Sequence, residues 1–176
     1  MRLVNFIIIL ILFHCSSCTK TEYEKKRNLE NKIIGKTWKQ LEKEKNLVPL
    51  GEGKSITEGK EFIELIFQYF KPLTIDEARE LVVYSAETFL DNLNSNEKLN
   101  ELLDKPYPMK WIQIRIHIYN PDYSEIEPPG ICVAHYAKNN IRYFIYNEKD
   151  YEIIYEETYK EALEKVKNNQ QTDSIL

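Results

Sequence analysis

Residues 111–119 read Trp-Ile-Gln-Ile-Arg-Ile-His-Ile-Tyr and alternate strictly between apolar and polar side chains. Successive side chains of a β-strand point to opposite faces of its sheet, so this period of two predicts a strand that is buried on one side. The side expected in the core carries the isoleucines at positions 112, 114, 116 and 118. The other side carries the residues that we take as a candidate binding face for a protein or a glycan: Trp111, Arg115, His117 and Tyr119.

This face has a second interpretation, which is that aromatic residues simply favour strands. Nine of the twelve tyrosines lie between Tyr107 and Tyr159. Tyrosine buries its ring and keeps a polar tip, so it suits both half-exposed sheets and recognition surfaces. The composition therefore leaves the two interpretations open.

Further strands are expected after a proline-containing loop at residues 120–130. They cover residues 131–137 and 141–146, joined at Lys138-Asn139-Asn140, where asparagine tolerates a positive φ. Residues 151–155 could add a fourth strand, and residues 156–166 form a closing helix in this interpretation.

Helical signals dominate the chain before residue 106. Thr74-Ile-Asp-Glu77 has the pattern of a capping box and predicts a helix that continues to about Leu93, after which Ser95 can cap a short helix. Residues 55–70 are apolar on nearly all sides, which favours a buried helix. Residues 46–54 are expected to form a loop, and apolar residues at three- or four-residue spacing from Leu29 to Leu41 predict an amphipathic helix after a loose, charged spacer.

Helices first and strands afterwards predict an α+β fold, with an antiparallel sheet of three to four strands and helices packed on one face. We expect this domain to cover residues 56–167. A signal peptide (residues 1–17) and a charged spacer with an amphipathic helix (residues 18–55) precede it, and a polar tail (residues 168–176) follows.

The amino terminus has the pattern of an export signal. Arg2 precedes an apolar run from Leu3 to Phe13 that only Asn5 interrupts. Eleven helical residues span about 16 Å, which is short of the roughly 30 Å of a hydrocarbon core. The run is therefore typical of a signal-peptide hydrophobic region.

The run Cys15-Ser16-Ser17-Cys18 resembles the lipobox of bacterial lipoproteins. The resemblance implies cleavage before Cys18 and its linkage to diacylglycerol, which anchors the protein to a membrane of the cell envelope. Cys15 departs from the pattern, because an aliphatic residue is usual at that position. Lipidation at Cys15 would instead place bulky His14 at the cleavage site. The same residues are also compatible with secretion into the periplasm or medium, and with an uncleaved anchor.

Composition and motifs exclude several classes of function. The net charge is −4, so the chain has no excess of basic residues to attract nucleic acid, and its five glycines are too few for most phosphate-binding loops. Gly51-Glu-Gly53-Lys54-Ser55 lacks the first glycine of a P-loop, because Val48 occupies that position. We therefore expect neither a cofactor nor nucleic acid as a partner.

Metal or thiol chemistry would have to use His117, Cys132 and His135, which supply too few ligands for a structural zinc site. We expect no metal, and Cys132 as a small buried side chain. Three glutamates near the carboxyl terminus suggest a cation or acid–base site, but lysines at helical spacing favour a solvated helix face instead; they are Glu157, Glu161 and Glu164.

The domain itself is similar to a family of small uncharacterised bacterial proteins. The similarity rests on the segments at 73–81, 94–99, 106–108, 112–116 and 157–162, and covers about residues 70–165. This similarity implies that the segment is a genuine domain, and it implies no particular activity.

The sequence thus favours a lipid-anchored protein of the cell envelope whose domain binds another envelope protein or a surface component without catalysis. The alternative is a small exported hydrolase that uses His117.

Overall fold

The computed structural model describes residues 2–57 and 60–173, and within them the α+β class is confirmed. The chain begins with helix α1 (Arg2–Lys45), followed by strands β1 (Val48–Thr57) and β2 (Lys60–Tyr69). Helices α2 (Ile75–Asn94) and α3 (Glu97–Asn100) come next. A 3₁₀ turn (Met109–Trp111) then leads into β3 (Ile112–Ile118), β4 (Val133–Ala137), β5 (Asn140–Tyr146), β6 (Tyr151–Thr158) and helix α4 (Tyr159–Asp173).

The sheet is larger than predicted and is mixed. Its six described strands follow the chain in the order β1-β2-β3-β4-β5-β6. β2 and β3 pair in parallel and the other neighbours pair antiparallel. The parallel pair requires a crossover, which α2 and α3 provide. The expectation of three to four antiparallel strands therefore understated the sheet.

The missing strands come from two wrong local predictions. Residues 46–54 are not a loop, because β1 begins at Val48, and residues 55–70 are not a helix, because they form the end of β1 and all of β2. In β2 the buried side chains are Ile63, Leu65 and Phe67, at the spacing of a strand. Phe62 and Ile66, on the other face, are also apolar, so the period of two is hidden in the sequence.

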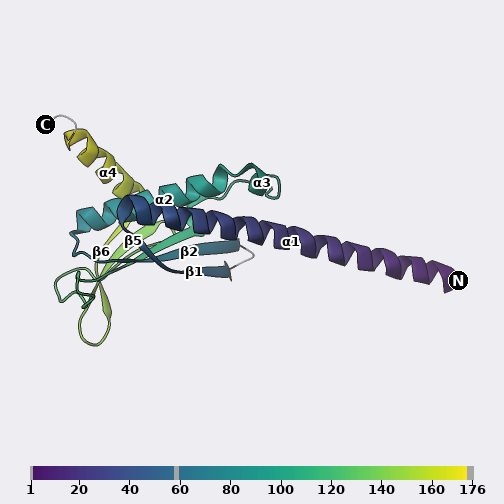
Figure 1. Ribbon diagram of the computed structural model, residues 1–176, viewed down its shortest axis with the longest axis horizontal. Helices are drawn as coiled ribbons and strands as arrows, with labels where there is room; N and C mark the ends of the chain where they lie inside the picture. Colours follow the sequence, from purple (N-terminus) through teal and green to yellow (C-terminus); the bar gives the residue numbers. More distant parts are fainter. Residues whose placement is uncertain (1, 58–59, 174–176) are drawn as a thin grey trace.

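The strand predicted from the alternating isoleucines is confirmed. β3 alternates between buried and half-buried residues along its length, and its isoleucines lie in the core with exposures of at most 1%. α1, α2 and α4 cover this isoleucine face of the sheet, as Figure 1 shows for α1 and α2 above the strands. The opposite face, called the open face below, carries Arg115 and His117 and is not covered by any helix of the described part.

Capping explains where α2 and α4 begin. The predicted capping box at Thr74 and Glu77 is confirmed. Asn96 caps α3, whereas Ser95 ends α2 instead of beginning the next helix. A reciprocal pair of bonds between Thr158 and Glu161 starts α4 at residue 159, so residues 156–158 belong to β6.

α1 is one continuous helix, so the loose spacer expected ahead of Glu30 is wrong. The amphipathic part is confirmed, since Ile33, Ile34 and Leu41 are buried in the core. Figure 1 shows the first half of α1 projecting beyond the sheet. In the described residues no helix combines the length and apolarity of a membrane span.

The division of the chain at residues 18, 56 and 168 stays a prediction. β1 joins the sheet from Val48 onwards, and α4 continues to Asp173. Cys18 lies within α1, and its side chain is outside the described part.

Candidate functional site

The open face of the sheet holds a small polar cluster around Glu64. Glu64 pairs across the strands with Gln113 of β3 and, on the other side, with Gly53 of β1. A side chain at position 53 would come within 3.2 Å of the Glu64 carboxylate, so the glycine leaves the space that the carboxylate occupies. Arg115 Nε donates a hydrogen bond of 2.9 Å to Glu64 Oε1.

His135 completes this cluster from β4, where it pairs with Arg115. Its Nε2 atom lies 3.4 Å from Glu64 Oε1 but outside hydrogen-bond geometry. Contact with His135, followed by the charge of Arg115, holds the pKa of Glu64 below its usual value of 4.5, although burial opposes this. Among the described residues Arg115 hydrogen bonds to the protein only through Nε, so its terminal amino groups are available to a ligand.

His117 lies between two cavities on this side of the molecule. One, of about 190 Å³, is lined by Arg115, His117, Val133, His135, Phe144 and Tyr151. The other, of about 230 Å³, is lined by His117, Ile118, Tyr119, Glu125, Ile126, Cys132, Tyr146 and Tyr151. Burial, and then the charge of Arg115, lowers the pKa of His117 below 6.5. This shift favours the neutral imidazole.

Exposed apolar and aromatic side chains continue the same face towards the edge of the sheet. Phe144 of β5 pairs with Ile153 of β6, and Tyr146 pairs with Tyr151 with ring centroids 5.2 Å apart. Tyr151 is 54% exposed and Ile153 is 47% exposed. Apolar side chains this accessible next to a guanidinium group are typical of a recognition surface.

The structure divides the candidate binding face that the sequence predicted. Arg115 and His117 do share the open face, and Tyr119 lines the cavity next to His117. Trp111 is separate, because it ends the 3₁₀ turn before β3 and packs edge-on against Tyr107 at 6.5 Å. Trp111 thus belongs to a different cavity, at the other end of β3.

The sequence alone does not identify Glu64, Phe144 and Tyr151 as part of this site, and it suggests His135 only for metal or thiol chemistry. Glu64 was assigned to a helix, and strand pairing brings it within reach of Arg115 and His135. The clustering of tyrosines after residue 107 indicates an aromatic surface but does not show where on the sheet it lies.

The thiol and metal hypotheses find little support in the described residues. Cys132 is half-buried, its Sγ donates to the carbonyl of Phe144 at 3.4 Å, and burial raises its pKa. A thiol that remains protonated is a weak nucleophile. In the described part of the chain no group of three or more metal-binding side chains is arranged to hold an ion.

The prediction of a solvated glutamate face is wrong for Glu157. This residue lies in β6 rather than on a helix, and it is 5% exposed. Its carboxylate accepts bonds from Arg79, Tyr143 and Lys165. Glu157 therefore ties β6 to α2 and α4 and has a structural role.

The comparisons with known proteins add no assignment: no family model, no curated protein and no solved structure matches the chain. The candidate site therefore rests on its own geometry.

The Glu64 cluster predicts a pH-dependent effect on stability. Because the folded-state pKa of Glu64 is lowered, its ionised form stabilises the fold above about pH 4.5, and this contribution is lost as the pH falls through the folded-state value. Glu64→Gln should therefore destabilise the protein at pH 7 and have a smaller effect at pH 3. Urea unfolding at both pH values measures this difference.

The exposed residue Glu80 on α2 supplies the control, because Glu80→Gln should change the unfolding free energy little at either pH. If Glu64→Gln lowered the unfolding free energy equally at pH 7 and pH 3, the electrostatic role of this cluster would be contradicted.

Proposed function

We propose that the protein is a lipid-anchored component of the cell envelope that binds another envelope protein through the open face of its sheet, without catalysis. The lipid would be attached at Cys18, as the resemblance to a lipobox implies. The observation that carries the binding role is the open face itself. Two cavities there share His117 and Tyr151, and exposed apolar side chains surround them.

The chemistry of the face favours a ligand with an anionic or carbonyl group beside an apolar side chain. The free amino groups of Arg115 suit such an oxygen, because the guanidinium fork donates in pairs. Phe144 and Tyr151 supply apolar walls next to it. A carboxylate or backbone carbonyl next to an aromatic residue of a partner protein meets both requirements.

An exported hydrolase is the second candidate, favoured by the neutral imidazole of His117 in a cavity. General-base catalysis also needs a group that orients the imidazole, commonly a carboxylate. In the described residues no carboxylate hydrogen bonds to His117. The binding role requires no such partner, and it is preferred for that reason.

Site-specific photo-cross-linking tests the binding face. A photoreactive phenylalanine analogue is placed at Tyr151, on the open face, and as a control at Lys160, which is exposed on α4. In intact cells we expect a discrete cross-linked protein from position 151 and none from position 160.

Adding Arg115→Glu to the Tyr151 probe should reduce the yield of that product at least fivefold, because the exchange reverses the charge offered to the ligand. Lys43→Glu is the matched control, since Lys43 is exposed on α1, which covers the opposite face of the sheet. Equal cross-linking from positions 151 and 160, or a product that Arg115→Glu leaves unchanged, would contradict the proposed binding face.

A further inference from the structure

The end of the domain from which α1 projects contains a second group of exposed or half-buried apolar and basic side chains, with acidic residues among them. They lie on α1, at the end of β1, after α3 and before β3; we call them the anchor end, defined as Tyr23, Lys26, Ile56, Leu103, Lys105 and Trp111. Ile56 is 71% exposed and Tyr23 is 53% exposed. Neither side chain is needed to fill the core.

The anchor end begins one helical turn after Cys18. Glu22, Tyr23 and Lys26 of α1 line a cavity together with Leu102 and Leu103. At 1.5 Å per residue, five residues of helix place Tyr23, the first residue of the anchor end, about 8 Å along the axis from Cys18. Because α1 is continuous here, no flexible linker separates the lipidated residue from the body of the domain.

We propose that the anchor end rests on the phospholipid headgroups, with Ile56 and Tyr23 in contact with the membrane interface. This inference rests on the proposed lipidation of Cys18. Aromatic and basic side chains are the residues that proteins concentrate at membrane interfaces. The surface around the two cavities has mixed charge, because Lys105 lines one of them and three acidic residues line the other (Glu22, Glu101 and Asp104). A zwitterionic bilayer, whose headgroups carry both phosphate and ammonium groups, matches this mixed charge.

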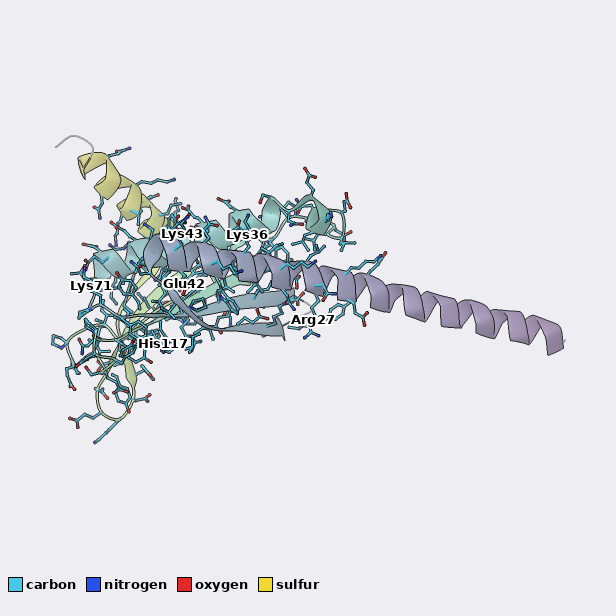
Figure 2. All side chains as sticks on the ribbon, in the orientation of Figure 1. Arg27, Lys36, Glu42, Lys43, Lys71 and His117 are labelled. Carbon is cyan, nitrogen blue, oxygen red and sulfur yellow. The ribbon has the colours of Figure 1, made fainter. Side chains whose placement is uncertain are left out.

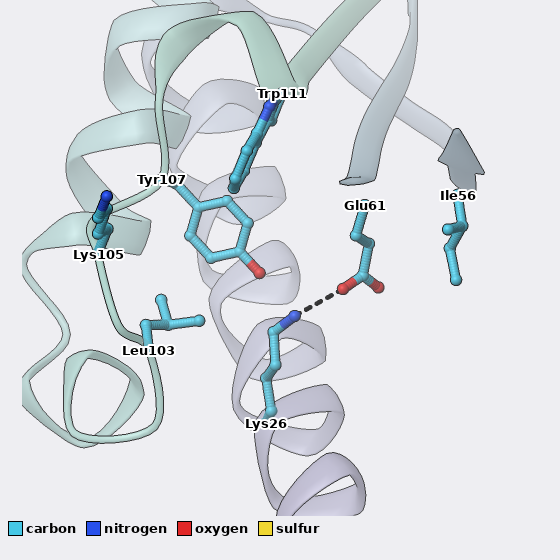
Figure 3. Close-up of a pocket in the computed structure, with 7 residues that line it drawn as sticks. All are labelled: Lys26, Ile56, Glu61, Leu103, Lys105, Tyr107 and Trp111. Carbon is cyan, nitrogen blue, oxygen red and sulfur yellow. Dashed lines mark hydrogen bonds and ion pairs between the residues drawn. The ribbon is translucent and has the colours of Figure 1, made fainter. Parts of the chain in front are cut away.

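An ion pair and an aromatic ring hold the side chain of Lys26 in place in this cavity. Figure 3 shows Lys26 and Glu61 facing each other, with Tyr107 and Trp111 beside them and Ile56 at the far side. Lys26 Nζ lies 2.6 Å from Glu61 Oε2 and 5.8 Å from the centre of the Tyr107 ring. The cavity has a volume of about 250 Å³.

A buried carboxylate fixes α1 to the sheet at this point. Glu30 is 1% exposed and accepts bonds from Lys54 of β1, at 2.9 Å, and from the hydroxyl of Tyr107. Lys26 lies 3.4 Å from the same carboxylate. The helix that leaves the membrane is therefore held by β1 and by the segment before β3, so the domain cannot swing freely about its anchor.

This orientation places the open-face cavities away from the bilayer. β2 and β3 are parallel and both start at the anchor end. His117 follows Trp111 by six residues, about 20 Å along a strand. Figure 2 shows His117 on the side of the domain opposite to the projecting half of α1. A partner protein in the envelope can therefore reach this face while the anchor end is on lipid.

The two tryptophans of the chain test this arrangement. Trp38 follows Cys18 by 20 residues, about 30 Å along α1, whereas Trp111 lies at the anchor end. The acylated protein, processed at Cys18, is reconstituted in phosphatidylcholine vesicles that contain a lipid with a nitroxide on its headgroup. Trp111 (in W38F) should be quenched at least twofold more strongly than Trp38 (in W111F).

A pair of surface variants provides the control. Ile56→Asp should reduce the quenching of Trp111 at least twofold, and Ile153→Asp, at the distant edge strand, should leave it unchanged. Mass spectrometry of the same samples separates the two proposals, since an unacylated chain overturns the proposed anchoring and this inference with it. If the chain is acylated and bound to vesicles but its two tryptophans are quenched equally, only this inference is overturned. The same holds if a second copy of the chain or another protein shields Trp111 from the quencher.

Discussion

Replacing Glu157 with alanine should lower the free energy of unfolding by about 3–5 kcal/mol, because the loss of one member of a buried ion pair leaves its partner's charge uncompensated. Glu157 accepts from Arg79 Nε at 2.6 Å, from the Tyr143 hydroxyl at 2.8 Å and from Lys165 Nζ at 2.7 Å. Arg79 is only 4% exposed and would retain Asp76 as its remaining acidic partner.

The ionisation of Glu157 agrees with this role. Burial alone would raise its pKa, but the bonds from Lys165, Arg79 and Tyr143 together outweigh burial and hold the pKa below 4.5. The carboxylate is therefore charged at neutral pH and satisfies donors from α2, β5 and α4. Its loss removes the polar contacts that hold these elements around one point.

Urea unfolding at pH 7 measures this prediction, and Glu164 provides a matched control. Glu164 lies on α4 with its side chain 64% exposed, so Glu164→Ala should change the unfolding free energy by no more than about 0.5 kcal/mol. Glu157→Gln keeps an acceptor oxygen for Tyr143, so its loss of unfolding free energy should lie between those of Glu157→Ala and Glu164→Ala. A loss below about 1 kcal/mol for Glu157→Ala would show that the network does not hold the fold together.

Local patterns predicted those elements whose two faces differ in polarity. In β3 the isoleucines alternate with polar residues, and in α2 the capping box marks the first turn, so both elements were predicted. The connection between β4 and β5 was also predicted, and Asn139 has the positive φ expected of an asparagine there; Lys138 has a positive φ as well, which was not expected. In each case the signal lies within a few neighbouring residues.

Pairing between strands that are distant in the sequence determines the elements that local patterns predicted wrongly. β2 has apolar residues on both faces, and only its position between β1 and β3 distinguishes it from a buried helix. β1 contains Pro49, Gly51 and Gly53, which are typical of loops; an edge strand tolerates them because one side of its ladder has no partner. The register that places Glu64 next to Arg115 is not visible in either segment alone.

The candidate site was predicted in part for the same reason. The alternation in β3 placed Arg115 and His117 on one face, but the 3₁₀ turn separated Trp111 from them. The predicted closing helix begins at residue 156, three residues before the start of α4, and this error places Glu157 on a helix instead of in β6. The capping pair of Thr158 and Glu161 was present in the sequence and would have placed the start of α4 correctly.

The largest expected effect on location comes from Cys18. A lipoprotein carries three acyl chains at this residue, and each buried methylene contributes about 0.8 kcal/mol to membrane binding, so detachment would be negligible. Without the thiol there is no site for the diacylglyceryl thioether. Cys18→Ala should therefore move the protein from the membrane fraction to the soluble fraction or leave it unprocessed, whereas Cys15→Ala should leave the membrane fraction unchanged.

The most direct measurement is the mass of the amino-terminal peptide of the protein purified from membranes of cells grown with labelled palmitate. Lipid anchoring predicts a peptide that begins at Cys18 and carries the labelled acyl chains, and no label in the Cys18→Ala variant. An unlabelled peptide that begins at Met1, or at any residue without a lipid, would contradict it.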